Sequence, residues 1–282
     1  DTYRAWRVGL GAGVFGVGML LDRAGSDTLE ALTAAEGAGF FGLGLLADLN
    51  GDDVYRVSQA GQGCGGPGGV GWLLDRAGDD LYEAVDRPRD VPEAAGITDP
   101  VSRAQGAALG LADGGAPWPG GCGLLADQEG NDRYRAGDAA QGYAELGGVG
   151  WLVDLRGDDD HDLATGGLGQ GRQLGVGLSY DGNGRDSYAC HGGGGLGAAD
   201  HLGLGLCVDD RGEDTYTLRE NGLGCAAGPG LALFVDGEGD DRYAVDDPAS
   251  SFGRAVPPCS CEHALARAQV RRAFFLDGAG RD

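Results

Sequence analysis

The sequence predicts an all-β protein folded as a parallel β-solenoid, also called a parallel β-helix, of about nine coils with about 27 residues per coil. Three observations predict this fold. A segment of the form Asp-x-x-Gly-x-Asp-x-Tyr recurs along the chain, alternating Gly and apolar residues precede most copies, and 59 of the 282 residues are Gly without the three-residue period of collagen. Right-handed coiling is expected from the general handedness of parallel crossovers, and a β-propeller is the main alternative.

Each copy of the repeated segment contains two Asp residues that lie five positions apart. The first Asp of the copies is Asp22, Asp48, Asp75, Asp127, Asp154, Asp181, Asp209, Asp236 and Asp277. The second Asp is Asp27, Asp53, Asp80, Asp132, Asp159, Asp186, Asp214, Asp241 and Asp282. A Gly lies three positions after the first Asp in every copy, from Gly25 to Gly280. The repeat implies that each coil buries its apolar residues against the coils on either side.

In most copies, the six residues before the first Asp read Gly, apolar, Gly, apolar, apolar, apolar, as in 69–74, and this pattern predicts a strand. We expect Val70, Trp72 and Leu74, and their equivalents, to face the core. The opposite face would then be a flat Gly/Leu face, which contains Leu20, Leu46, Leu73, Leu125, Leu152, Phe234 and Phe275. Soluble monomers rarely expose such a stripe, so either a protein partner or self-association covers it, or the strand faces the other way.

A second strand is expected directly after the second Asp, as in 53–57. Its Tyr lies seven positions after the first Asp in most copies, at Tyr55, Tyr82, Tyr134, Tyr188, Tyr216 and Tyr243, whereas Leu29 and His161 are the exceptions. Such a series favours rings packed along the solenoid, although an aromatic stack can also bind a glycan. A Gly-rich third segment closes each coil.

Irregular spacing predicts three insertions into the solenoid. The interval between the third and fourth copies is about twice the usual length, but the landmarks inside it indicate one coil with insertions near 86–101 and 112–120. A third insertion is expected near 246–262. The first and last residues have the same phase in the repeat. We therefore expect residues 1–282 to be a single solenoid segment of a longer repeat protein.

The net charge of −23 excludes some classes of partner. The sequence contains Arg but no Lys, and its isoelectric point is about 4.3. A surface of this charge argues against binding to nucleic acid or to an anionic membrane. No apolar run is long enough to span a bilayer. Cations are the expected partners.

The two sets of Asp are predicted to form two columns of carboxylates along one edge of the molecule and to bind metal ions there in repeated surface sites. Equivalent residues of adjacent coils stack about 4.8 Å apart, where two unit charges repel by about 0.9 kcal/mol in bulk water. Arg23, Arg76, Arg156 and Arg211 offset part of this repulsion. Ca²⁺ would offset more, because it takes six to eight oxygen ligands in flexible geometry. The alternative is a metal-free ladder in which Asp caps turns and pairs with Arg.

Two parts of the repeat resemble known calcium loops. Gly-Asp-Asp-Leu-Tyr at 78–82 resembles the RTX nonapeptide, which implies a Ca²⁺-bound parallel β-roll of secreted bacterial proteins. Asp-Leu-Asn-Gly-Asp-Asp at 48–53 resembles the calcium loop of FG-GAP repeats. The resemblance covers about eight residues of each coil, so it implies ion binding and no single family.

Other chemistry-bearing residues are few. Cys259, Cys261 and His263 could offer ligands to Zn²⁺, but a fourth ligand is absent, so a local disulfide, free thiols or plain loop residues are favoured. His191 and His201 have no identifiable nucleophile nearby, and no catalytic residue is predicted. The seven Cys residues do not decide the redox compartment.

These observations predict a non-enzymatic, calcium-stabilised scaffold or interaction module that is extracellular or lies on a bacterial cell surface. Calcium is present at millimolar concentration outside cells, where weak repeated sites would be filled. The alternative is a polysaccharide-active enzyme or a glycan-binding β-helix.

Overall fold

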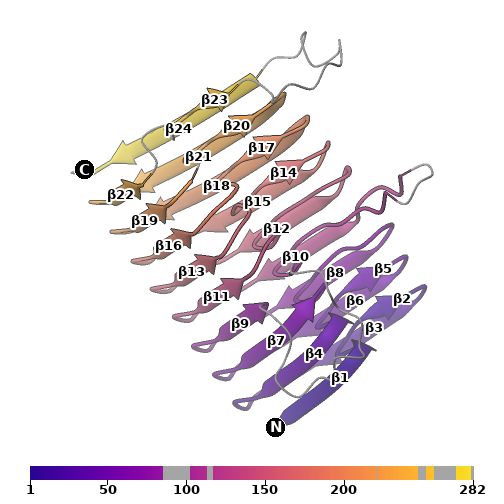
Figure 1. Cartoon of the computed structure of the whole chain (residues 1–282). Helices are drawn as coiled ribbons and strands as arrows, with labels where there is room; N and C mark the ends of the chain where they lie inside the picture. The colour runs from indigo at the N-terminus through magenta and orange to yellow at the C-terminus, as the bar shows by residue number, and fades with distance from the viewer. Residues whose placement is uncertain (85–101, 113–116, 221, 247–251, 257–270, 281–282) are drawn as a thin grey trace.

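The structure is a computed structural model that describes residues 1–84, 102–112, 117–220, 222–246, 252–256 and 271–280. Over these residues the chain is all-β and contains no helix. Parallel strands stack as a β-solenoid of about 8 turns with ~27 residues per turn, as the sequence predicts (Figure 1). The described residues also include no helix that is long and apolar enough to cross a membrane.

Two long sheets form the walls of the solenoid. The tyrosine sheet consists, among the described residues, of the strands that follow the second Asp: β1 (Thr2–Gly9), β4 (Thr28–Ala35), β7 (Val54–Gln59), β9 (Leu81–Ala84), β11 (Arg133–Ala136), β13 (Asp160–Leu163), β16 (Ser187–Cys190), β19 (Thr215–Leu218) and β22 (Arg242–Val245). The leucine sheet consists of the strands that lead into the first Asp: β3 (Val17–Leu21), β6 (Leu43–Ala47), β8 (Val70–Leu74), β10 (Cys122–Ala126), β12 (Val149–Val153), β15 (Val176–Asp181), β18 (Gly203–Arg211), β21 (Gly230–Glu238) and β24 (Arg271–Ala279).

The Gly-rich segment of each coil forms a third, narrow ladder. Its short strands are β2 (Gly13–Val14), β5 (Gly39–Phe40), β14 (Gly171–Arg172), β17 (Ala199–Asp200), β20 (Ala226–Ala227) and β23 (Ala255–Val256). Single parallel bridges through Gly65, Ala108 and Ala144 connect β5 to β14. Each coil therefore contacts its neighbours along three lines.

Equivalent positions of successive coils pair directly. Leu73 of β8 pairs with Leu46 of β6 and with Leu125 of β10. Because β8 pairs with β10, the long interval between them lies within one turn. The predicted insertion at 86–101 lies outside the described residues, and so does most of the one at 246–262. In the insertion near 112–120, Leu111 and Trp118 form an antiparallel bridge.

The leucine sheet faces opposite to the sequence-based expectation. Leu46, Leu73, Leu125 and Leu152 are fully buried, whereas Trp72 and Trp151 are exposed. The reason lies at Gly71, since a Cβ atom there would lie 2.1 Å from the carbonyl oxygen of Cys64 in the Gly-rich segment. That segment packs against the strand so closely that only Gly fits, and the face that carries Gly must therefore point inward. The Gly/Leu face predicted to bind a partner lies in the core, and that prediction was wrong.

The aromatic residues of the tyrosine sheet form a buried stack, as the packing interpretation predicts. Tyr55, Tyr82, Tyr134, His161, Tyr188, Tyr216 and Tyr243 stack with ring centroids 4.6–5.1 Å apart and nearly parallel planes. All except Tyr243 are buried. The stack packs beside the inward Leu residues, so these buried rings do not face a glycan in solution.

The outer face of the leucine sheet is apolar. Its outward residues lie one, three and five positions before the first Asp, and the largest exposed ones are Val17, Met19, Leu21, Trp72, Trp151, Leu231, Phe274 and Leu276. Arg272 is the one charged residue at these positions among the described coils. A flat sheet face of this composition is available to another surface.

We predict that Leu73→Ala lowers the free energy of unfolding by about 2–5 kcal/mol, because it creates a cavity in the core. Leu74→Ala on the outer face should cost about 1 kcal/mol, because that side chain is only half-buried. Urea denaturation of the two variants measures the difference. A larger loss for Leu74→Ala would show that the strand faces the other way.

Candidate metal centre

Both Asp columns lie inside the solenoid, at the turn that joins the leucine sheet to the tyrosine sheet. Buried members of the columns are Asp27, Asp48, Asp53, Asp75, Asp80, Asp127, Asp132, Asp154, Asp159, Asp181, Asp186, Asp209, Asp214, Asp236 and Asp241. Asp22 and Asp277 are half-buried, and Asp282 lies outside the described residues. The columns were expected at the surface, and the structure corrects this expectation.

The turn between the two Asp residues is tightly stacked on its neighbours. A Cβ atom at Gly51 would lie 1.6 Å from the carbonyl oxygen of Gly25, and one at Gly78 would lie 1.5 Å from that of Gly51. The invariant Gly is therefore required by the close approach of successive backbones. Because the turns stack so closely, the carboxylates of adjacent coils are held in close register.

The second Asp of each coil forms a ladder of hydrogen bonds along the solenoid. Its backbone N–H donates to Oδ1 of the second Asp in the following coil. These bonds, 2.6–2.8 Å long, join Asp27 to Asp53, Asp53 to Asp80, Asp80 to Asp132, Asp132 to Asp159, Asp159 to Asp186, Asp186 to Asp214 and Asp214 to Asp241. One oxygen of each carboxylate is thus used in capping, as the metal-free alternative predicts.

The first Asp has partners for both oxygens in Asp75, Asp127 and Asp154, whereas one oxygen lacks a partner in Asp48, Asp209 and Asp236. In Asp75, Oδ1 accepts the backbone N–H of Ala77, and Oδ2 accepts the hydroxyl of Tyr55 from the preceding coil at 2.5 Å. The pairs Tyr82–Asp127 and Tyr134–Asp154 repeat this contact at 2.6 and 2.5 Å. The aromatic stack therefore holds the first Asp column in place.

The other oxygen of the second Asp is buried without a hydrogen-bond partner. This is true of Oδ2 in Asp53, Asp80, Asp132, Asp159, Asp186 and Asp214. Ligand atoms from both columns lie within 4.8 Å of one another in the groups Asp22/Asp27/Asp48, Asp48/Asp53/Asp75, Asp75/Asp80/Asp127, Asp132/Asp154/Asp159 and Asp159/Asp181/Asp186. A buried carboxylate oxygen without a partner is costly, so these groups require a proton or a cation.

The electrostatics of the second Asp column agree with this requirement. Burial, and then repulsion by neighbouring carboxylates, raises the pKa of Asp80 to about 9 and that of Asp132 to about 11. Burial raises the pKa of Asp53 to about 7. Burial also raises the pKa of Asp75, but the hydrogen bond from Tyr55 opposes this effect by favouring the charged form. Burial raises the pKa of Asp127 and Asp181, in the first column, well above the usual value too, so both columns take up protons when no cation is bound.

The Arg residues pair outside the solenoid. Arg156 forms an ion pair with Glu129, and Arg211 lies 3.9 Å from Asp210. The acids that precede the second Asp, such as Asp52 and Asp79, are exposed and form a separate outer ladder. The Arg pairing proposed for the metal-free alternative is thus not made by Arg156 or Arg211.

One coil departs from this pattern at His161. The imidazole occupies the position of a Tyr ring in the stack and is 1 % exposed. Its Nε2 lies 3.6 Å from Oδ2 of Asp181, and neither ring nitrogen has a hydrogen-bond partner. Both carboxylate oxygens of Asp181 also lack a partner. Burial lowers the pKa of His161 to about 4, so the imidazole is neutral at pH 7.

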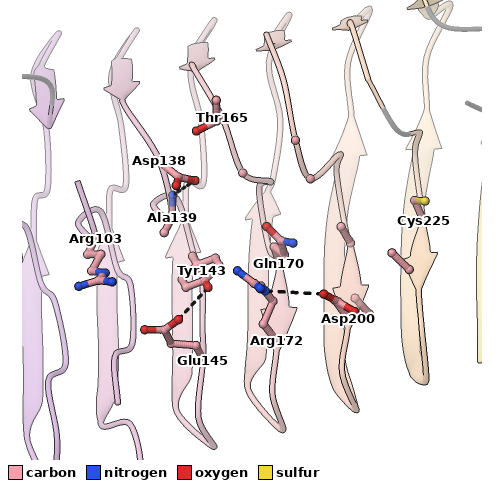
Figure 2. A pocket seen from close by; sticks show the side chains of 16 residues that line it. Arg103, Asp138, Ala139, Tyr143, Glu145, Thr165, Gln170, Arg172, Asp200 and Cys225 are labelled. Atoms are coloured by element: carbon pink, nitrogen blue, oxygen red, sulfur yellow. Dashed lines mark hydrogen bonds and ion pairs between the residues drawn. The ribbon is translucent and has the colours of Figure 1, made fainter. Parts of the chain in front are cut away.

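A polar groove of about 400 Å³ lies outside the core, along the Gly-rich segments of several coils (Figure 2). Polar and charged side chains in the groove interact with one another. The hydroxyl of Tyr143 donates to Glu145 at 3.0 Å, and Arg172 lies 3.8 Å from Asp200. Arg103 also lines the groove. These groups could bind a polar ligand by hydrogen bonds.

The remaining predicted residues do not form a site. The stretch from Cys259 to His263 lies outside the described residues. The described cysteines are free thiols. His191 pairs with Asp162, and His201 pairs with Asp200, both near the surface.

The spacing between the second Asp and the Tyr is a signal in the sequence that the second Asp is buried. The second Asp lies two positions before the Tyr, and alternate residues of a strand share a face. Once the Tyr is placed in the core, the Asp must point inward too.

Comparisons with protein-family models, curated proteins and solved structures found no match for this chain. The fold and the site therefore define its class without reference to relatives. It is a parallel β-solenoid whose interior contains two columns of carboxylates.

We predict that the metal-free protein loses stability as the pH rises. The second Asp binds a proton more tightly when folded than when unfolded, because its folded pKa is raised from 3.8 to about 7 at Asp53 and about 9 at Asp80. The folded state therefore holds more protons above pH 4, and stability falls with increasing pH. Melting temperatures measured in chelator between pH 4 and 9 should decrease steadily. A flat or rising profile would contradict the described protonation.

Proposed function

We propose that the chain is a non-enzymatic scaffold of the extracellular space or a bacterial cell surface, stabilised by a column of Ca²⁺ ions inside the solenoid. The observation that carries this proposal is the partnerless Oδ2 of the second Asp, which recurs from coil to coil. A carboxylate oxygen of the second Asp lies within 4.8 Å of first-Asp ligand atoms from its own or an adjacent coil.

Charge balance supports a divalent ion. Each regular coil contributes two buried carboxylates, so one divalent ion per coil neutralises the columns. A single proton per coil leaves one negative charge in a poorly hydrated interior. The repulsion between charges about 4.8 Å apart rises to about 3.5 kcal/mol at an effective dielectric constant of 20.

The ligand chemistry favours Ca²⁺ over Mg²⁺. The groups offer carboxylate oxygens on a rigid backbone spacing. Ca²⁺ accepts six to eight oxygens at varied angles, whereas Mg²⁺ demands a near-octahedral arrangement and retains its waters. Millimolar extracellular Ca²⁺ would fill repeated sites of modest affinity, which is the basis for the proposed location.

We predict that Ca²⁺ raises the melting temperature of the protein and that a chelator lowers it. Ligand at 100 times its dissociation constant stabilises the folded state by about 2.7 kcal/mol per site. Asp132→Asn should reduce the response to Ca²⁺, because the amide retains the oxygen that accepts the Asp80 N–H but loses the charge. Differential scanning calorimetry with Ca²⁺ and with chelator measures both effects.

Asp52→Asn provides the matched control for this experiment. Asp52 is exposed, and its Oδ1 accepts the N–H of Asp79 in the outer ladder. This variant should respond to Ca²⁺ as the wild-type protein does. Identical melting with Ca²⁺ and with chelator would refute the Ca²⁺ column. An unchanged response in Asp132→Asn would show that Ca²⁺ binds elsewhere.

The interaction part of the proposal rests on the outer face of the leucine sheet, and its proposed occupant is a second copy of the chain. Nine strands about 4.8 Å apart and about five residues long cover roughly 600–700 Å². This approaches the ~800 Å² per partner of a standard protein interface. Because this face is nearly uncharged, two copies could pack it together without juxtaposing their acidic residues.

We predict that Trp72→Glu combined with Trp151→Glu abolishes self-association. Both Trp side chains are exposed, so the substitutions leave the core intact. Sedimentation velocity over a range of concentrations should show dimers for the wild type and monomers for the variant. The control is Thr215→Glu combined with Thr217→Glu. Both residues lie on the outer face of the tyrosine sheet, so this variant should leave the dimer unchanged. A wild type that is monomeric at every concentration contradicts self-association.

The alternative function is glycan binding or polysaccharide cleavage, and the polar groove is the observation that favours it. Tyr143, Arg103 and Arg172 provide hydrogen-bond donors there. Binding of an acidic polysaccharide that is lost in Arg172→Ala would favour this function over the scaffold.

A further inference from the structure

The coil that contains His161 differs from its neighbours at two buried positions. His161 replaces the Tyr of the stack. Ser179, which is also buried, replaces the Leu two positions before the first Asp, where the preceding coil has Leu152. The Leu/Tyr cluster ends before these polar substitutions, at Tyr134 and Leu152, whereas the cluster that contains Tyr188 continues past them.

The substitution changes the partners of Asp181. The hydroxyls of Tyr55, Tyr82, Tyr134 and Tyr188 donate to the first Asp of the next coil, as Tyr134 does to Asp154 at 2.5 Å. The imidazole of His161 is shorter, and its Nε2 stops 3.6 Å from Oδ2 of Asp181. This separation is too long for a hydrogen bond. It leaves a nearly fully buried nitrogen and both oxygens of a buried carboxylate without partners.

These atoms lie beside a group of three carboxylates. Ligand atoms of Asp159, Asp181 and Asp186 lie within 4.8 Å of one another. The Oδ2 atoms of Asp159 and Asp186 have no hydrogen-bond partner either. Asp181 belongs both to this group and to the contact with His161, so one imidazole and three carboxylates lie around Asp181 between two adjacent coils.

We infer that His161, Asp159, Asp181 and Asp186 form a binding site for a single transition-metal ion such as Zn²⁺. This inference rests on the proposed ion binding of the columns. It assigns a different ion to the one position along the columns that lies beside His161. Imidazole nitrogen is a ligand suited to Zn²⁺, Cu²⁺, Fe²⁺ and Ni²⁺, whereas sites made only of oxygen suit Ca²⁺, Mg²⁺ and Mn²⁺.

The observed separation fits an ion between the two groups. Zn²⁺ lies about 2.0–2.1 Å from His nitrogen and about 2.0–2.2 Å from carboxylate oxygen, so two such ligands at a tetrahedral ion are about 3.4 Å apart. The separation of 3.6 Å between Nε2 and Oδ2 requires only a small adjustment. Ligation through Nε2 places the imidazole proton on Nδ1.

The test uses tag-free, metal-stripped protein that is loaded with Co²⁺ or Zn²⁺ in the presence of excess Ca²⁺. Bound metal is measured by mass spectrometry after gel filtration, and Co²⁺ is also followed by its visible absorption. The wild type should retain about one more equivalent of Co²⁺ or Zn²⁺ than His161→Tyr does. The Tyr variant should fold normally, because it restores the residue and the hydrogen bond of the regular coils.

Two further variants make the result specific. Asp181→Asn should also lose the equivalent. His191→Gln, which alters a surface His paired with Asp162, should retain it. Equal metal content in wild type and His161→Tyr, or no Co²⁺ and Zn²⁺ retained by the wild type, would overturn the inference and leave His161 as a packing residue.

The outcome is separable from that of the proposed Ca²⁺ column. Loss of the Co²⁺ equivalent in His161→Tyr supports the site even if Ca²⁺ does not change the melting temperature. Conversely, a Ca²⁺-dependent melting temperature without the Co²⁺ difference supports the column and rejects the transition-metal site.

Discussion

Two carboxylates in each regular coil lie inside the solenoid, and their charge must be balanced where little water can reach it. Removing a carboxylate from water costs several kcal/mol unless hydrogen bonds or an opposite charge replace the water. In coils such as that of Asp75, the first Asp accepts hydrogen bonds from a Tyr hydroxyl and from the turn, whereas the second Asp retains one oxygen without a partner. The regular structure of the coil, including the invariant turn and the aromatic stack, is arranged around these groups.

Glycine allows the backbone to approach as closely as this arrangement requires. At Gly51 the turns of adjacent coils approach too closely for any side chain. At Gly71 the Gly-rich segment packs directly on the leucine sheet. The coil is therefore thin at Gly71, while Leu, Tyr and Asp side chains fill it near the turn. The difference in thickness concentrates the polar interior at the turn.

Protons and cations compete for the same oxygens in this interior. The raised pKa of the second Asp means that each coil can be neutralised in part by a proton, and more fully by a divalent ion. His161 alters this competition in one coil, because a neutral imidazole can bind a metal ion but donates no hydrogen bond to Asp181 in this geometry. A repeat protein can in this way contain one level with different chemistry inside an otherwise uniform column.

The sequence by itself determined the repeat, the solenoid fold, the stacking of the Tyr rings and the identity of the clustered Asp residues. These follow from spacing, because every coil repeats the same pattern and places equivalent residues in register. Only the tertiary structure decided which face of the leucine sheet is inside and that the first Asp column is internal. An alternation of Gly with apolar residues is compatible with either orientation, since both faces lack charge. The choice depends on the close approach of the Gly-rich segment at Gly71, a contact between parts of the chain that no local pattern specifies.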